Sequence, residues 1–162
     1  MQGDMKPNEI YEKLKEEFGE DILDFVEEEH YDPFINVKPD KIRDICLFLR
    51  DGEDLDFDYL TLLSGMDLGE NLGVVYHLYS LNIKHSIVLK LEVPKEKPDV
   101  PTVERVWRTA DWHEREAYDM FGVNFAGHHN LIRILCPYDW EGFPLRRDYK
   151  EPEEYHGMKV PY

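Results

Sequence analysis

The sequence predicts an α+β fold, in which helices pack on one face of a mostly antiparallel sheet and an extended, irregular C-terminal segment follows. Apolar residues recur at helical or strand spacing in the order helix, strand, strand, helix, strand, strand, strand, helix. Turn residues and prolines separate these runs. The 162 residues suffice for one compact core. We therefore expect a core domain at residues 1–121 and an extended partner-binding segment at residues 122–162.

The N-terminal part should supply two helices and two strands. Ile10, Leu14 and Phe18 recur at every fourth position, which predicts a short first helix. Pro39 can open a second amphipathic helix, and Gly52 ends its apolar stripe. The strands expected between these helices are Ile22–Glu28 and Phe34–Val37.

Three strand-like runs follow the second helix. They span Phe57–Met66, Gly73–Leu81 and Ile83–Val93. Only Asn82 separates the last two runs, and this connection is too short for a crossover helix. We expect these two strands to be antiparallel neighbours.

A third helical region lies within Thr102–Phe121. It is either nearly continuous or restarts at Asp111, where a capping pair with Glu114 is possible. Helical spacing puts the Glu114 carboxylate on the apolar stripe, where a charge must be paired or shift its pKa. Arg115 and Asp119 are four residues apart, so we expect an ion pair on the opposite, exposed face.

Composition excludes several kinds of partner and cofactor. The net charge of −16 argues against binding to nucleic acid or anionic lipid, because phosphate contacts need clustered Lys and Arg. No run of about 18 apolar residues is present, and the N-terminus lacks the apolar region of a secretory signal, so we expect an intracellular chain without a membrane span. Cys46 and Cys136 are too few to hold an iron–sulfur cluster, which needs about four thiolates.

A metal or catalytic site near the third helix is disfavoured by spacing. The candidate side chains are His113, Glu114, Glu116, His128 and His129. No second histidine follows His113 at the interval of a helical zinc motif, and adjacent histidines rarely ligate one ion together. Glu114 and Glu116 project from different helix faces, which does not suit paired acid–base work. His128 should instead bond backbone groups in a turn after Gly127. We expect no catalytic, cofactor-binding or metal-binding residue in this chain.

The stretch from Trp112 to Tyr149 is aromatic-rich, charged and irregular, as in segments that pack on another surface. Its motif positions are Glu114, Arg115, Glu116, Asp119, Phe121, Gly122, Gly127, His128, Arg133, Trp140, Pro144, Leu145, Arg146, Arg147, Asp148 and Tyr149. This pattern closely resembles the C-terminal motif of the C, or thirty-kilodalton, subunit of respiratory complex I (NADH:quinone oxidoreductase). Ile132 stands where that family usually has the first of two arginines.

The resemblance implies a non-catalytic structural subunit in the peripheral arm of a proton-translocating complex. It would pack on the large (D, forty-nine-kilodalton) subunit near the iron–sulfur subunits and the quinone site, on the cytoplasmic face of the membrane. NADH, flavin, iron–sulfur clusters and quinone would belong to the wider complex, a translocase, and none to this chain. The alternatives are the equivalent subunit of an energy-converting hydrogenase or other complex I relative, a free-standing binding module, and a small carboxylate- or metal-dependent hydrolase.

The arginines of the motif should anchor the C-terminal segment. We expect Arg146 to pair with Glu114, with Glu116 or with an acid of the large subunit, and Arg133 to be more important because of Ile132. Loss of Arg146 should cost more than loss of Lys95, an expected surface reference. Beyond Tyr149 the chain should be weakly tied down.

Overall fold

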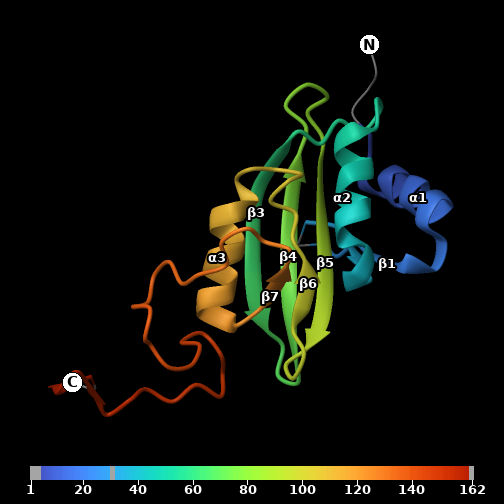
Figure 1. Cartoon of the computed structure of the whole chain (residues 1–162). Coiled ribbons are helices and arrows are strands. Elements are labelled where there is room, and N and C mark those ends of the chain that lie inside the picture. The colour runs from blue at the N-terminus through green and yellow to red at the C-terminus, as the bar shows by residue number, and fades with distance from the viewer. Residues whose placement is uncertain (1–4, 30–31, 161–162) are drawn as a thin grey trace.

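The computed structural model describes residues 5–29 and 32–160. Three α-helices and a five-stranded sheet form the domain, as predicted (Figure 1). The helices are α1 (Pro7–Phe18), α2 (Ile42–Asp51) and α3 (Ala110–Phe121), and short 3-10 turns, η1 (Gly19–Asp21) and η2 (Pro39–Lys41), follow α1 and precede α2. The sheet contains β1 (Ile22–Val26), β2 (Phe34–Val37), β3 (Tyr59–Asp67), β4 (Asn71–Tyr79) and β5 (Ser86–Pro94).

The strands are ordered β1-β2-β5-β4-β3 across the sheet. β4 and β5 form the predicted antiparallel pair, in register from Asn71↔Pro94 to Tyr79↔Ser86. β1–β2 and β3–β4 are antiparallel as well, whereas β2 and β5 run parallel. The parallel pair makes this a mixed, mostly antiparallel sheet, and it places the N-terminal hairpin beside β5.

All three helices contribute to one buried core on one face of the sheet. Phe18 of α1 packs edge-on against Phe48 of α2, with ring centroids 5.6 Å apart. Burial raises the pKa of Tyr76 on β4, and the nearby Glu114 of α3 and Cys46 of α2 raise it further. These neighbours place α2 and α3 over the same sheet face. The predicted arrangement of the helices is confirmed.

The third helix restarts after a turn, which is one of the two alternatives that the sequence predicts. Residues 102–109 form turns, and α3 begins at Ala110 and ends at Phe121. It packs closely on β3, since a Cβ at Gly65 would lie 2.6 Å from the Phe121 ring. Glu114 is fully buried, as its position on the apolar stripe predicted.

The core continues past Phe121. Strands β6 (Asp99–Pro101) and β7 (Asn124–Ala126) pair in parallel, and Val123 and Phe125 belong to the buried cluster. The chain then runs along α3 without regular structure, away from α1 and α2 (Figure 1). A small hairpin of β8 (Glu154–Tyr155) and β9 (Met158–Lys159) lies near its end. Over the described residues, none of the helices has the length and apolarity needed to cross a bilayer.

Candidate functional site

Asp119 attaches the C-terminal segment to α3. Its carboxylate is fully buried and accepts hydrogen bonds from Arg133 and from three successive backbone N–H groups. The donors are Arg133 Nη1 at 2.7 Å, Ile134 N at 3.0 Å, Leu135 N at 2.7 Å and Cys136 N at 2.8 Å. Burial alone would raise the pKa of Asp119, but these hydrogen bonds outweigh it and lower that pKa. The predicted exposed pair between Asp119 and Arg115 is wrong, because Asp119 faces inward.

Arg115 and Arg133 instead satisfy carbonyl groups of the irregular chain. Arg115 donates from Nε to Ile132 O at 3.2 Å and from Nη2 to Arg133 O at 3.4 Å. Arg133 donates from Nη2 to Gly142 O at 2.8 Å as well as to Asp119. The Ile132 side chain is 53% exposed, so this position contributes its carbonyl group to the intrachain contacts and its side chain to the surface.

Residues 143–146 cap the C-terminus of α3. Leu145 N donates to Met120 O at 3.1 Å, and Arg146 Nε donates to Phe121 O at 2.5 Å. Helix carbonyls at this end have no intrahelical donor, and a cation there also suits the helix dipole. The Arg146 guanidinium lies 4.6 Å from the centroid of the Phe143 ring. Within the described chain Arg146 thus binds a carbonyl group, and its expected intrachain pairing with a glutamate is wrong.

Gly122 makes this cap possible. It ends α3 in the left-handed conformation, at φ +77°, which a side chain disfavours. A Cβ at this position would also lie 2.6 Å from Arg146 Nη2 and 2.6 Å from Phe143 Cε2. The motif therefore needs glycine here for backbone conformation and for space.

A second buried carboxylate ties the arginine pair to the sheet. Asp67, at the end of β3, accepts hydrogen bonds from Lys95 Nζ at 2.9 Å, Arg147 N at 2.8 Å and Gly69 N at 2.8 Å. The hydrogen bond from Lys95 holds the pKa of Asp67 well below its usual range. Asp148 Oδ1 lies 3.8 Å from the same lysine. Lys95 is therefore part of the anchor, so Lys95→Ala is not a neutral reference for Arg146→Ala, and the predicted order of the two losses stays a prediction.

The last motif residues contact the chain that follows them. Trp140 Nε1 donates to the Tyr149 hydroxyl at 3.0 Å. Asp139 accepts from the Tyr155 hydroxyl at 2.8 Å and from His156 Nε2 at 2.9 Å. These exposed contacts fold the end of the chain back on residues 139–140.

Glu114 holds the turn that precedes α3. Its two carboxylate oxygens accept hydrogen bonds from Thr102 Oγ1 at 2.5 Å and from Val103 N at 2.7 Å. Burial raises the pKa of Glu114 to about 7. Glu116, two residues along, is exposed and lines a different pocket with His113 and other residues of β3 and α3. The two glutamates thus lie in separate environments, as their spacing predicted.

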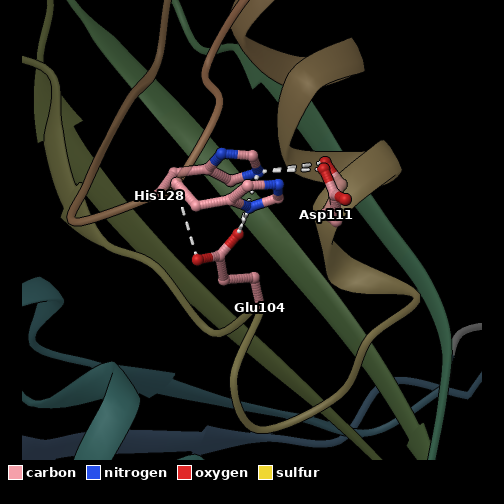
Figure 2. Close-up of side chains that lie close together, drawn as sticks. Glu104, Asp111 and His128 are labelled. Carbon is pink, nitrogen blue, oxygen red and sulfur yellow. Dashed lines mark hydrogen bonds and ion pairs between the residues drawn. The ribbon is translucent and has the colours of Figure 1, made fainter.

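Four side chains gather beside the first turn of α3. Glu104, Asp111, His128 and His129, which we name the carboxylate–histidine cluster, place one ligand atom each within 4.8 Å of the others. Figure 2 shows the carboxylates of Glu104 and Asp111 directed at the stacked histidine rings. His129 Nδ1 donates to Glu104 Oε2 at 2.6 Å, and this hydrogen bond raises the pKa of His129. Burial alone would raise the pKa of Glu104, but the hydrogen bonds from His129 outweigh it and lower that pKa.

The His128 ring is fully buried and bonds backbone groups, as predicted. Its Nδ1 accepts from Asn130 N at 3.0 Å, and its Nε2 lies 3.2 Å from Asp111 O. Because Nδ1 faces an N–H donor, Nε2 must carry the ring proton and donate it. The turn after Gly127 is fixed in this way against the start of α3.

Large apolar side chains are exposed along α3 and the segment that covers it. We name as the apolar surface Trp112 (65% exposed), Ile132 (53%), Leu135 (63%), Tyr138 (93%) and Leu145 (56%). The Arg115 guanidinium lies 5.5 Å from the Trp112 ring and bonds the Ile132 carbonyl, so α3 and the segment are joined within this surface.

Sequence reasoning missed four residues that position these groups. Thr102 bonds to Glu114, and Glu104 bonds to His129. Asp67 accepts hydrogen bonds from Lys95 and from the Arg147 backbone. They lie outside the motif, and no periodicity connects them with it. The one available signal was the capping pattern at Asp111, which marked the turn where Glu104 and Thr102 meet α3.

Comparison with known proteins agrees with the motif. The family model described as "Respiratory-chain NADH dehydrogenase, 30 Kd subunit" matches residues 35–155. The C subunit of the NADH-quinone oxidoreductase of Chloroherpeton thalassium is 48% identical, and the match covers 98% of this chain and 68% of the relative. Its counterpart in Chlorobium phaeobacteroides is also 48% identical, over 94% of this chain and 93% of the relative.

Solved structures share the fold. The trypsin-resistant fragment (1–134) of Nqo5 superposes with a TM-score of 0.62 at 25% identity, over 75% of this chain and 99% of the fragment. A chain of an archaeal respiratory membrane complex, the membrane-bound sulfane sulfur reductase, gives a TM-score of 0.73 at 24% identity, over 90% of this chain and 86% of the other, and this likeness concerns the fold alone. By motif, family match and close relatives, the chain belongs to the thirty-kilodalton subunit family of respiratory-chain NADH dehydrogenase, the family of the C subunit of complex I.

Proposed function

We propose that this chain is a non-catalytic structural subunit in the peripheral arm of a proton-translocating NADH:quinone oxidoreductase, at the cytoplasmic face of the membrane. In this role it binds the large D subunit through the apolar surface, near the iron–sulfur subunits. Electrons pass from NADH through flavin and iron–sulfur clusters to quinone in other subunits. The residues of the motif hold the binding surface in shape.

The exposure of the apolar surface is the observation that carries this proposal. Tyr138 is 93% exposed and Trp112 is 65% exposed, although both are large side chains of the type that anchors protein interfaces. The backbone beneath them is bonded to Asp119 and capped on α3, so little ordering remains to be done on binding. A rigid backbone with exposed aromatic side chains is what a constitutive subunit contact requires.

The arginine pair supports the same surface in two ways. The Arg146 guanidinium donates to the last carbonyl group of α3. Arg147 is exposed, and among the described residues it bonds Asp67 through its backbone N–H alone. We propose that Arg147, rather than Arg146, offers its guanidinium to an acidic residue of the partner. Arg146 then acts on assembly through the shape of the segment.

The first prediction tests the surface. The triple variant Trp112→Ala, Leu135→Ser, Tyr138→Ser should lower the yield of assembled complex by roughly tenfold or more, since each tenfold corresponds to about 1.4 kcal/mol. The tagged chain replaces the native copy in cells, and the complex is quantified by native electrophoresis and NADH:quinone activity. The isolated variant should melt like wild type, because all three side chains are exposed.

The matched control is Leu81→Ser. It removes the same type of side chain as Leu135→Ser, at a 58% exposed position in the β4–β5 connection. It should leave assembly unchanged. Wild-type assembly of the triple variant would show that the apolar surface is not an interface. Co-purification with hydrogenase subunits in place of an NADH-oxidising module would assign the chain to another complex.

A further inference from the structure

We propose that Glu104, Asp111 and His129 bind a single divalent transition-metal ion such as Zn²⁺ beside the first turn of α3, with His128 as the residue that positions Asp111. This site is separate from the apolar surface. The proposed structural role of the chain does not account for the clustering of these carboxylate and histidine side chains.

The donor atoms come from three segments that the fold brings together. Glu104 lies in the turn before α3, Asp111 in the first turn of α3, and His129 in the loop after β7 (Figure 2 shows Glu104 and Asp111 next to the histidine rings). The ligand atoms of the cluster lie within 4.8 Å of one another. Small rotations of these side chains can bring such atoms to the Zn–N and Zn–O distances of about 2.0–2.2 Å. His129 is the most mobile candidate, with 59% of its side chain exposed.

An unsatisfied oxygen points into the cluster. Asp111 Oδ1 is buried, and none of the described residues donates a hydrogen bond to it. His128 Nε2 lies 3.3 Å from this oxygen, but the ring N–H is directed to the Asp111 carbonyl group at 3.2 Å. A buried carboxylate oxygen that accepts no hydrogen bond is unfavourable. A bound cation would satisfy it.

The local charge also favours a cation. The carboxylates of Glu104 and Asp111 are joined by that of Glu114, whose Oε2 lies 3.8 Å from His128 Nε2. Imidazole and carboxylate together suit Zn²⁺ and neighbouring first-row ions.

The site is open on one side. Glu104, Asp111 and His129 line a hollow of about 550 Å³ together with Arg105 and Arg108. Both arginines are exposed, and no ion pair joins either of them to the two carboxylates in the described structure. Water or a small anion can complete the coordination from this hollow, and the arginines would favour an anion.

His128 supports the site without ligating the ion. Coordination at Nε2 would move the ring proton to Nδ1, which faces the Asn130 N–H at 3.0 Å. Two donors would then oppose each other. His128 therefore keeps its proton on Nε2 and holds the Asp111 backbone, as groups behind metal ligands commonly do.

Zn²⁺ titration of the untagged, chelator-treated full chain by calorimetry tests the site. Wild type should bind one ion per chain, and Asp111→Asn and His129→Ala should each bind about tenfold or more weakly. His156→Ala is the matched control, because it removes another exposed histidine that is hydrogen-bonded to an aspartate, and it should bind as wild type does. Zn²⁺ should raise the melting temperature of wild type and of the control only. Equal affinity across all four proteins, or no binding by wild type, overturns the proposal.

Imidazole nitrogen NMR separates the two histidines. Zn²⁺ coordinated at His129 Nδ1 would displace the proton that this nitrogen donates to Glu104, and the proton would pass to solvent. Added Zn²⁺ should therefore shift the Nδ1 resonance of His129 and leave the Nε2–H of His128 protonated. Loss of that proton on Zn²⁺ binding would contradict the assignment of His128 as a positioning residue.

Discussion

Asp119 and Glu114 are both buried carboxylates of α3, yet their pKa values shift in opposite directions. Asp119 accepts hydrogen bonds from three backbone N–H groups and one arginine, which lower its pKa despite burial. Glu114 accepts two hydrogen bonds from the described residues, and burial raises its pKa to about 7. The number of donors decides which effect dominates. Asp119 is thus a charged anchor, whereas the pKa of Glu114 is raised because burial outweighs its hydrogen bonds.

Asp119→Ala should destabilise the chain by about 3–5 kcal/mol, because it leaves the partly buried Arg133 and three N–H groups without their acceptor. Urea denaturation measures the loss. Asp40→Ala, at an exposed aspartate, is the control and should stay within about 0.5 kcal/mol of wild type. Similar midpoints for the two variants would show that Asp119 is not an anchor.

Glu114→Ala and Glu116→Ala form a second comparison, within one helix. Glu114→Ala leaves the Val103 N–H and the Thr102 hydroxyl unsatisfied, which costs about 1–3 kcal/mol for a buried polar group. Glu116 is exposed, so its replacement should change stability little. Thermal melting of both variants at pH 7 is the measurement, and a larger loss for Glu116→Ala would reverse our assignment.

At the scale of single residues, the sequence predicted burial better than partners. Glu114 was placed inside because helical spacing put it on an apolar stripe. Asp119 lies opposite that stripe, so the spacing predicts exposure. The structure buries it instead, because residues 133–136 cover this side of the helix. Those residues have no periodicity that would reveal their position. Local spacing cannot reveal a contact made by an irregular segment.

At the scale of elements, the end of α3 depends on a segment that follows more than twenty residues later in the chain. Leu145 and Arg146 satisfy the Met120 and Phe121 carbonyls that the helix leaves open. Gly122 turns the chain away so that Phe143 and Arg146 can approach. Helix, glycine and segment therefore form one unit.

Gly122→Ala should be more destabilising than Gly127→Ala. Both residues have positive φ, so each substitution strains the backbone by about 1–2 kcal/mol. At Gly127 the nearest atom to an added Cβ is Thr102 Cγ2 at 3.5 Å, whereas at Gly122 the Cβ would overlap Phe143 and Arg146. Denaturant unfolding measures the loss of unfolding free energy for each variant. The amount by which the loss for Gly122→Ala exceeds that for Gly127→Ala is the cost of the overlap. Equal losses would mean that the segment moves aside without cost.

The elements themselves were largely predictable. Phe34–Val37 was predicted with its observed bounds, and the β4–β5 hairpin follows from a connection too short for a helix. The parallel pairing of β2 with β5 was not predictable from local pattern, since the partners are separated by α2 and two strands. The division into a core and a partner-binding segment remains a prediction, although Val123 and Phe125 extend the core beyond Phe121.

At the scale of the whole molecule, Asp67 joins the sheet to the C-terminal segment. Its carboxylate receives Lys95 and the backbone of Arg147, so one side chain links β3, the chain after β5 and the motif. The net charge of −16 makes such internal compensation of acidic groups more important, because uncompensated carboxylates repel one another.

Acid should weaken this link. The folded-state pKa of Asp67 is lowered, chiefly by Lys95, so its contribution to stability is present above the unfolded pKa of about 3.9 and is lost as pH falls below it. The difference in unfolding free energy between wild type and Asp67→Asn should therefore be largest near pH 7 and shrink as the pH falls below about 4. Denaturant unfolding of both proteins at pH 7 and below about pH 4 measures this difference. A difference independent of pH would show that the charge of Asp67 does not contribute.

The hydrogen bonds to Asp119 leave the side chains of residues 134–136 free to vary within this family. Three of the four donors to Asp119 are main-chain N–H groups, which every residue except proline possesses. Positions 134–136 can therefore exchange side chains across species while the loop keeps its shape, with proline as the forbidden substitution. A homologue can adapt its outward residues to a changed partner without altering the attachment, so recognition and scaffold are free to evolve at different rates.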